Sequence, residues 1–344
     1  MRVTLGDVCE KGSSNLKQSD VINKTGAYPI YGAAGYLGNV DFYHQDKPYV
    51  AVVKDGAGIG RTTLHPAKSS VIGTMQYLLP KSNVLPEYLY YVVQYMHLEK
   101  YFTGATIPHI YFKDYKAEQF NLDAMERQKE IVASLQKVET LIKVRQQQLQ
   151  KLDELVKARF VELFGDPLTN PKGYQEKYLS EIAEYWNGLT YKPDDVANEG
   201  TIVLRSSNIQ NASLDFADTV RVNCKIGTKK YVQDNDILMC SRNGSAKLVG
   251  KVALIKELSE PMSFGAFMMI IRSAYYPFLM TYFQLPAFRS QITTGATTTI
   301  NQITGRMLDN VKLAIPDIES AKDFSAFTNQ VDKSKLLQFF CFPI

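Results

Sequence analysis

A glycine-rich segment is the first feature of the sequence that could bind a phosphate. It reads Gly56-Ala57-Gly58-Ile59-Gly60-Arg61 and follows the apolar run 49–53. The segment matches neither the G-x-x-x-x-G-K-[ST] pattern of a P-loop nor the G-x-G-x-x-G pattern of a dinucleotide fold, and no helical pattern follows it. We interpret it as a tight turn between two strands, whose backbone N–H groups, with Lys54 or Arg61, could contact a DNA phosphate.

Motifs for catalysis are missing from the sequence. There is no Asn-Pro-Pro-[Tyr/Phe] or Asp-Pro-Pro-Tyr to seat an amino group for methyl transfer, and Asp194 is not followed by the [Asp/Glu]-x-Lys of a nuclease. The four histidines share no metal-ligand spacing. Ser241 and Ser245 lack the surroundings of a nucleophile elbow. We therefore predict a chain that is not an enzyme and holds no metal.

Two stretches combine cationic side chains with hydrogen-bonding ones. Residues 237–255 contain three basic residues and no acid, and residues 54–68 contain Asp55 as their only acid. Cations neutralise phosphates, while Ser and Asn can bond to base edges, so the pattern favours a DNA-facing surface over an ordinary solvated loop. The predicted DNA contacts are Lys54, Arg61 and His65 in the first half of the chain and Ser206, Asn208, Arg242, Asn243 and Lys247 in the second.

The composition is that of a soluble globular protein. The chain has 344 residues, 45% hydrophobic and 22% charged, which is enough for two globular units. A net charge of +4 is too small to indicate nucleic-acid binding, so any cationic surface must be local. The four cysteines are scattered, and neither a secretory signal nor a membrane-length apolar run is seen. We expect a cytoplasmic protein with free thiols.

One long helix is predicted from about residue 125 to 164. This stretch contains neither Gly nor Pro, Asp123 with Glu126 resembles a capping box, and Gly165-Asp166-Pro167 ends it. At 1.5 Å per residue the helix would be roughly 55–60 Å long. Apolar residues recur at coiled-coil spacing, at Ile131, Leu135, Val138, Ile142, Leu149, Leu152, Val156 and Leu163. We expect this stripe to pack against a second helix, from this chain or another.

The segments on either side of this helix resemble each other. Matching motifs occur in the same order, with a separation that drifts as if loops were inserted into the second copy. The matches are Leu5-Gly6-Asp7-Val8 with Leu179-Ser180-Glu181-Ile182, Gly56 with Gly244, Gly60-Arg61 with Gly250-Lys251, Ile72–Met75 with Phe264–Phe267, Pro86 with Pro277, and Thr103-Gly104-Ala105-Thr106 with Thr294-Gly295-Ala296-Thr297. A second helix over about 320–335 would follow the second copy.

We therefore expect an α+β protein with two similar domains of mixed strands and helices. The predicted parts are a first domain (1–123), a spacer helix (124–165), a second domain (166–316) and a C-terminal helix (317–344). Because the apolar tail 336–344 does not continue the heptad pattern, we expect the second helix to be short and truncated.

These features resemble the specificity (S) subunit of type I restriction-modification systems, over nearly the whole chain. The most specific part is Thr-Gly-Ala-Thr-Ile-Pro-His (103–109) leading into Glu126–Ile131 and the long helix. Other similar motifs are Tyr28-Pro29-Ile30-Tyr31-Gly32, Gly35-Tyr36-Leu37-Gly38, Asp55-Gly56-Ala57 and Leu163-Phe164-Gly165-Asp166-Pro167.

The resemblance implies a non-catalytic DNA-recognition subunit. Each domain would be a target-recognition domain that reads one half of a bipartite, asymmetric site in double-stranded DNA. The two helices would pair antiparallel, set the spacing and dock two methyltransferase (modification) subunits, and a restriction/translocation subunit would join them. S-adenosylmethionine, ATP and Mg would belong to those subunits, with no cofactor in this chain. A helix of about 55 Å matches roughly 16 base pairs, a suitable distance between half-sites.

Two alternatives stay open. A short second helix would leave part of the stripe from Ile142 to Leu163 uncovered, so the chain could be a truncated or silent specificity cassette without a working complex. The same uncovered stripe predicts self-association of the isolated chain. The other alternative is a non-DNA binding module with a helical stalk, for which binding would not depend on salt.

Overall fold

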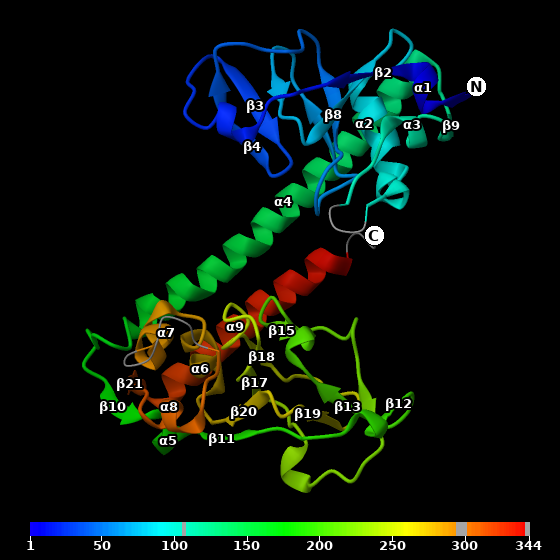
Figure 1. Ribbon diagram of the computed structural model, residues 1–344. Helices are drawn as coiled ribbons and strands as arrows, with labels where there is room; N and C mark the ends of the chain where they lie inside the picture. The colour runs from blue at the N-terminus through cyan, green and yellow to red at the C-terminus, as the bar shows by residue number, and fades with distance from the viewer. Residues whose placement is uncertain (105–107, 294–300, 341–344) are drawn as a thin grey trace. The chain divides into compact units, whose positions relative to one another are not determined.

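The computed structural model of the protein describes residues 1–104, 108–293 and 301–340 (Figure 1). The chain divides into two compact units, residues 1–144 and 145–344. This boundary falls inside α4 (Met125–Phe164), a single helix of 40 residues that belongs to both units. Among the helices described, none is long and apolar enough to cross a membrane.

The first unit is built on two small sheets, with a separate strand pair and short helices. One sheet is antiparallel, in the order β2 (Cys9–Ser13), β8 (Met75–Pro80), β5 (Tyr49–Val53), β6 (Thr62–His65). The other has the order β4 (Gly35–Val40), β3 (Tyr28–Gly32), β7 (Ser70–Val71), with β3 and β7 parallel. The strand β1 (Arg2–Thr4) pairs with β9 (Gln119–Asn121), and the α-helices are α1 (Leu5–Val8), α2 (Pro86–Tyr95) and α3 (Phe112–Tyr115).

The central strand β5 explains how this unit holds together. All five of its residues are buried, because alternate side chains enter two different apolar clusters. Val50 and Val52 pack with α2 residues such as Leu89, whereas Ala51 and Val53 pack with Tyr77 on the other face of the sheet. A continuous apolar run is the pattern expected of a strand covered on both faces.

The second unit repeats this plan with longer connections. Its antiparallel sheet has the order β11 (Glu184–Asn187), β20 (Met268–Arg272), β17 (Ile237–Cys240), β18 (Val252–Leu254). Its mixed sheet has the order β12 (Val196–Ala197), β16 (Arg221–Val222), β13 (Thr201–Leu204), β19 (Met262–Phe264), with β13 and β19 parallel.

Further strands and helices complete the second unit. The strands are β10 (Gln175–Tyr178), paired with β21 (Lys312–Ile315), and the hairpin β14 (Ile209–Gln210) and β15 (Ser213–Leu214). The helices are α5 (Leu179–Ile182), α6 (Tyr276–Tyr282), α7 (Pro286–Thr293), α8 (Gly305–Asp309) and α9 (Ile318–Phe340).

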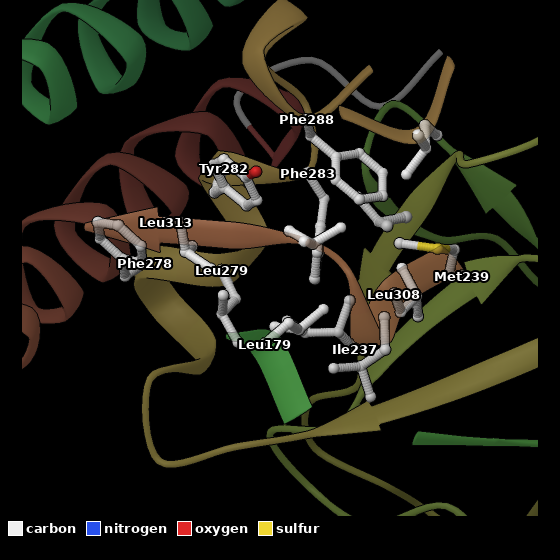
Figure 2. Close-up of a cluster of buried hydrophobic side chains, with 14 of the residues drawn as sticks. Leu179, Ile237, Met239, Phe278, Leu279, Tyr282, Phe283, Phe288, Leu308 and Leu313 are labelled. Carbon is white, nitrogen blue, oxygen red and sulfur yellow. The ribbon is translucent and has the colours of Figure 1, made fainter. Parts of the chain in front are cut away.

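An apolar cluster between the antiparallel sheet and the helices forms the larger core of this unit. Figure 2 shows Ile237 and Met239 of β17 beside Leu279, Phe283 and other side chains of the helices and their connections. All of these residues are buried. The alternate β17 residues, Leu238 and Cys240, enter a second cluster on the opposite face of the sheet, so β17 occupies the same central place as β5 in the first unit.

Matching hydrogen bonds confirm the internal repeat. In both units, the turn after the central strand is joined to a later segment by the same two backbone bonds. These are Gly56 N–H to Pro108 (3.0 Å) and Ile110 N–H to Lys54 (3.0 Å) in the first unit, and Asn243 N–H to Asn301 (3.3 Å) and Ile303 N–H to Ser241 (2.7 Å) in the second. The α+β fold with two similar domains is therefore present.

Two of the sequence matches are wrong by one residue. Gly56 was paired with Gly244, but the shared bonds place it opposite Asn243. The match of Ile72–Met75 is wrong by one residue in the opposite direction, because Met75 corresponds to Met268 in the strand ladders. Short motifs cannot fix the register of a repeat where loop lengths differ. Most of the Thr-Gly-Ala-Thr match lies outside the described residues.

The C-terminal helix is longer than expected. α9 spans Ile318–Phe340 rather than about 320–335, so the predicted early end is wrong. It packs antiparallel to the end of α4: the ring of Phe324 lies 5.7 Å from that of Phe160, whereas Lys335, farther along α9, pairs with Asp153, earlier in α4 (2.6 Å). The boundaries predicted for the four parts of the chain stay a prediction.

The stripe along α4 is only partly used for packing. Val156 and Leu163 pack against the core of the second unit, and Ile131 packs against the core of the first. Leu149 and Leu152 are half-buried, while Leu135, Val138 and Ile142 are exposed. The predicted stripe does not include Phe160 and Phe164, which are fully buried. Heptad spacing identifies contacts between two helices and does not identify side chains that pack into a globular domain.

Candidate nucleic-acid interface

Three of the predicted contact residues come together in the second unit. The amide of Asn243 donates to Ser206 Oγ (3.2 Å), and the exposed Arg242 lies next to it on the turn after β17. The guanidinium of Arg242 is 5.4 Å from the ring centre of Phe267, which is 60% exposed. We call Ser206, Arg242, Asn243 and Phe267 the second-unit corner. Sequence reasoning missed Phe267, because nothing in its local pattern places it near Arg242.

The backbone fixes this corner. The carbonyl of Phe267 accepts hydrogen bonds from Ser241 N–H (2.9 Å), Ser241 Oγ (2.9 Å) and Arg242 N–H (3.1 Å). The turn that carries Arg242 and the turn that carries Phe267 are therefore held together independently of the stacked side chains. The result is a cation and an aromatic ring on a rigid support, with amide and hydroxyl groups beside them.

The equivalent place in the first unit has different chemistry. The structural counterpart of Arg242 is Asp55, whose carboxylate pairs with Lys54 Nζ (2.8 Å) and with His109 Nδ1. We call Lys54, Asp55 and His109 the first-unit corner. All three side chains are partly exposed, at 26%, 23% and 31%. Here a carboxylate orients two nitrogen donors, whereas in the second unit the cation itself occupies the position.

Arg61 and Lys247 both lie on exposed loops. Arg61 is exposed on the turn between β5 and β6, and one of its guanidinium nitrogens donates to the carbonyl of Ala33 (3.0 Å). Lys247 is exposed on the corresponding connection between β17 and β18. Both positions suit a contact with a DNA phosphate, which needs charge at the surface and little else.

Two other predicted contacts are buried. His65 is 6% exposed and lies between the rings of Tyr31 and Tyr49, with Thr63 Oγ1 at 2.7 Å from its Nε2. Burial lowers the pKa of His65 to about 4, so the ring is neutral at physiological pH. In this structure His65 is a core residue, and we leave it out of the proposed interface.

Asn208 is fully buried as well. Its side-chain oxygen accepts from Arg205 N–H (2.8 Å), and its amide donates to the carbonyls of Asp215 (2.9 Å) and Asp218 (2.8 Å). All of these partners are backbone groups of one loop. Asn208 therefore shapes the loop that carries Ser206, and has no group left for a base edge.

Among the described residues, no group of three or more His, Cys, Asp or Glu side chains could hold a metal ion. The cysteines Cys9 and Cys240 are buried, and burial raises the pKa of the Cys9 thiol to about 12, which makes it a poor nucleophile. The described part of the chain thus offers surface charge and hydrogen-bonding groups.

Comparison with known protein families identifies the family of this chain. A model described as the type I restriction modification DNA specificity domain matches residues 1–154 and again residues 171–338, together most of the chain. The chain belongs to this family. As a member of the type I specificity family, it is a DNA-recognition subunit, and the twofold match corresponds to its two similar units.

Solved structures from type I restriction-modification systems share the fold. The S subunit of a type I restriction-modification system from M. genitalium matches with a TM-score of 0.59 and 14% identity, over 98% of this chain and 90% of that one. A chain from a structure described by the assembly and conformational transition of the type I R-M system matches with a TM-score of 0.53 and 15% identity, over 98% and 92%. At such identities the similarity concerns the fold.

Proposed function

We propose that the two units bind the two halves of an asymmetric site in double-stranded DNA, each through its own corner. One observation carries this proposal. Equivalent backbone bonds present Arg242 in one unit and Asp55 with His109 in the other. Contacts to the DNA backbone position a protein on the duplex, whereas side chains at base edges determine which sequence is bound. Two units with equivalent backbone hydrogen bonds at this turn but different side chains would therefore bind the duplex in the same orientation and select different bases.

We propose that catalysis is carried out by partner subunits and not by this chain. We propose that the helices α4 and α9 dock two methyltransferase subunits and that a restriction/translocation subunit joins the complex. In this proposal S-adenosylmethionine, ATP and Mg bind to those subunits, and this chain binds none of them. Family membership supports this proposal, as does the absence of catalytic motifs from the sequence.

The exposed middle of α4 is the proposed docking surface for those subunits. Leu135, Val138 and Ile142 are 37%, 51% and 45% exposed and lie three and four residues apart, on one face of the helix. Without its partners the isolated chain should bury this face against a second copy. Light scattering at micromolar concentration should show a mass above the monomer, and replacement of Val138 and Ile142 by Glu should lower it.

The decisive experiment is to sequence methylated DNA from cells that carry this chain with its modification subunits. A motif with two specific ends and an unread middle is the expected result. Binding of the purified complex to duplex DNA should fall steeply with salt, since each neutralised phosphate releases counterions. Methylation of no motif would favour a silent cassette, and salt-independent binding would favour a module that does not recognise DNA.

A further inference from the structure

We propose that Arg242 is the residue with which the second unit reads a guanine in its half-site. This inference rests on the proposed function and deepens it, because it assigns one base to one side chain. A guanidinium fits guanine through two parallel hydrogen bonds, to O6 and N7 in the major groove, and this is the commonest specific contact between a protein side chain and a base.

Arg242 differs from three other arginines of the second unit because no carboxylate among the described residues binds its N–H donors. Within the part of the second unit that the structure describes, three other arginines are held by carboxylates through two hydrogen bonds each: Arg205 by Asp218, Arg221 by Glu260 and Arg272 by Asp236. Arg242 contacts the Phe267 ring and, among the described residues, pairs with no carboxylate. Its five N–H donors are therefore available to a ligand at the surface.

The ring of Phe267 prepares Arg242 for binding. A cation over an aromatic face is stabilised without using its N–H groups, so the side chain loses less freedom when it binds. The Phe267 carbonyl also fixes the Arg242 backbone, as described above. Core packing does not account for a phenylalanine that is exposed on a turn. A role in supporting the side chain of Arg242 does account for Phe267.

Comparison with the first unit indicates that the position of Arg242 determines which base is selected. Asp55 occupies it there, and its carboxylate forms ion pairs with Lys54 and with His109. Asp55 thus acts as a positioning residue for two donors of another shape. Because a histidine or lysine cannot form the planar fork that arginine forms, the two units would present different donor geometry at matching points of their half-sites.

The test compares Arg242→Lys and Arg242→Gln in the full chain assembled with its modification subunits. First, the motif methylated by the wild-type complex is determined in cells. Affinities are then measured for duplexes that change each specific base pair of the motif, one at a time. Lys keeps the charge but loses the fork, so Arg242→Lys should reduce discrimination at a single G·C pair by roughly five- to 100-fold. All other positions, and the slope of affinity against salt, should stay unchanged.

Two controls make the result specific. Lys247→Gln removes a nearby surface charge, and it should weaken binding to all duplexes alike and reduce the salt slope by about one. Arg221→Lys changes an arginine that is already paired with Glu260 and should leave the motif intact. Phe267→Leu should relax the same base pair as Arg242→Lys, by a smaller factor.

Three outcomes would overturn the inference. If Arg242→Gln weakens binding to every duplex equally and Arg242→Lys leaves all positions specific, Arg242 contacts a phosphate. If the relaxed pair is A·T, the assignment to guanine is wrong. If the wild-type complex methylates no two-part motif, the proposed function fails, and the inference fails with it.

Discussion

At the scale of single residues, His65 provides a test of burial in the first unit. Its pKa is about 4 in the folded protein, and the ordinary value of about 6.5 returns on unfolding. The unfolded state therefore binds the proton more strongly. Stability that depends on neutral His65 is complete above about pH 6.5 and falls as the pH drops towards 4, by up to about 3 kcal/mol.

The measurement is an NMR titration of the His65 ring in the folded protein, together with unfolding free energies at about pH 7 and about pH 4.5. The ring should stay neutral down to near pH 4, and the His65→Gln variant should lose less stability than wild type between the two pH values. A midpoint near 6.5 would contradict the buried position between Tyr31 and Tyr49.

Phe160 tests how α4 is attached to the second unit. Its ring lies 5.1 Å from Phe164, 4.9 Å from Phe278 and 5.7 Å from Phe324, so one side chain joins α4, α6 and α9. Phe160→Ala should lower the free energy of unfolding of this unit by about 3–5 kcal/mol, because it leaves a cavity among packed rings. The neighbouring Val161 is 51% exposed, and Val161→Ala, measured by the same denaturant titration, should change stability by less than about 0.5 kcal/mol.

At the scale of elements, Gln128 anchors the start of α4 to the first unit. Its side chain is fully buried and makes three hydrogen bonds, accepting from Leu85 N–H (2.9 Å) and donating to the carbonyls of Asn83 (3.0 Å) and Asp123 (3.0 Å). The Asp123 carboxylate in turn accepts from Tyr88 Oη (2.7 Å). The beginning of the long helix is thus bonded to the beginning of α2.

Gln128→Ala should detach this end of the helix. Three buried polar groups would lose their partner, at a cost of about 2–4 kcal/mol. Hydrogen exchange should accelerate for amides 125–132 and stay unchanged for amides 156–164, where other contacts hold α4. Gln147→Ala, at an exposed site on the same helix, serves as the matched control and should leave both regions protected. Uniform acceleration along α4 would mean that Gln128 does not act locally.

At the scale of the whole molecule, the two recognition units should be separable in function. Exchange of residues 1–123 for the same part of another family member should change one end of the methylated motif and leave the other end intact. Exchange of residues 166–316 should have the complementary effect. The physical reason is that each unit has its own apolar cores and its own corner. Sequencing of methylated DNA gives the result, and a change at both ends from a single exchange would contradict independent recognition.

The sequence by itself determined the features that depend on order and spacing along the chain. The repeated motifs indicated two similar units, and the stretch without Gly or Pro indicated α4. Each of these is local, or repeats at a regular interval, so no knowledge of distant contacts is needed. The exposed cations Arg61, Arg242 and Lys247 could be selected for the same reason.

Only the tertiary structure decided which side chains are available and which partners they meet. His65 and Asn208 have the right chemistry for DNA but are buried, whereas Phe267 comes to lie under Arg242 from another turn. The pairing of Asp55 with His109 likewise joins residues far apart in the chain. Burial and pairing depend on how sheets and loops pack against each other. The spacing of residues within one segment does not show which distant segments it will contact.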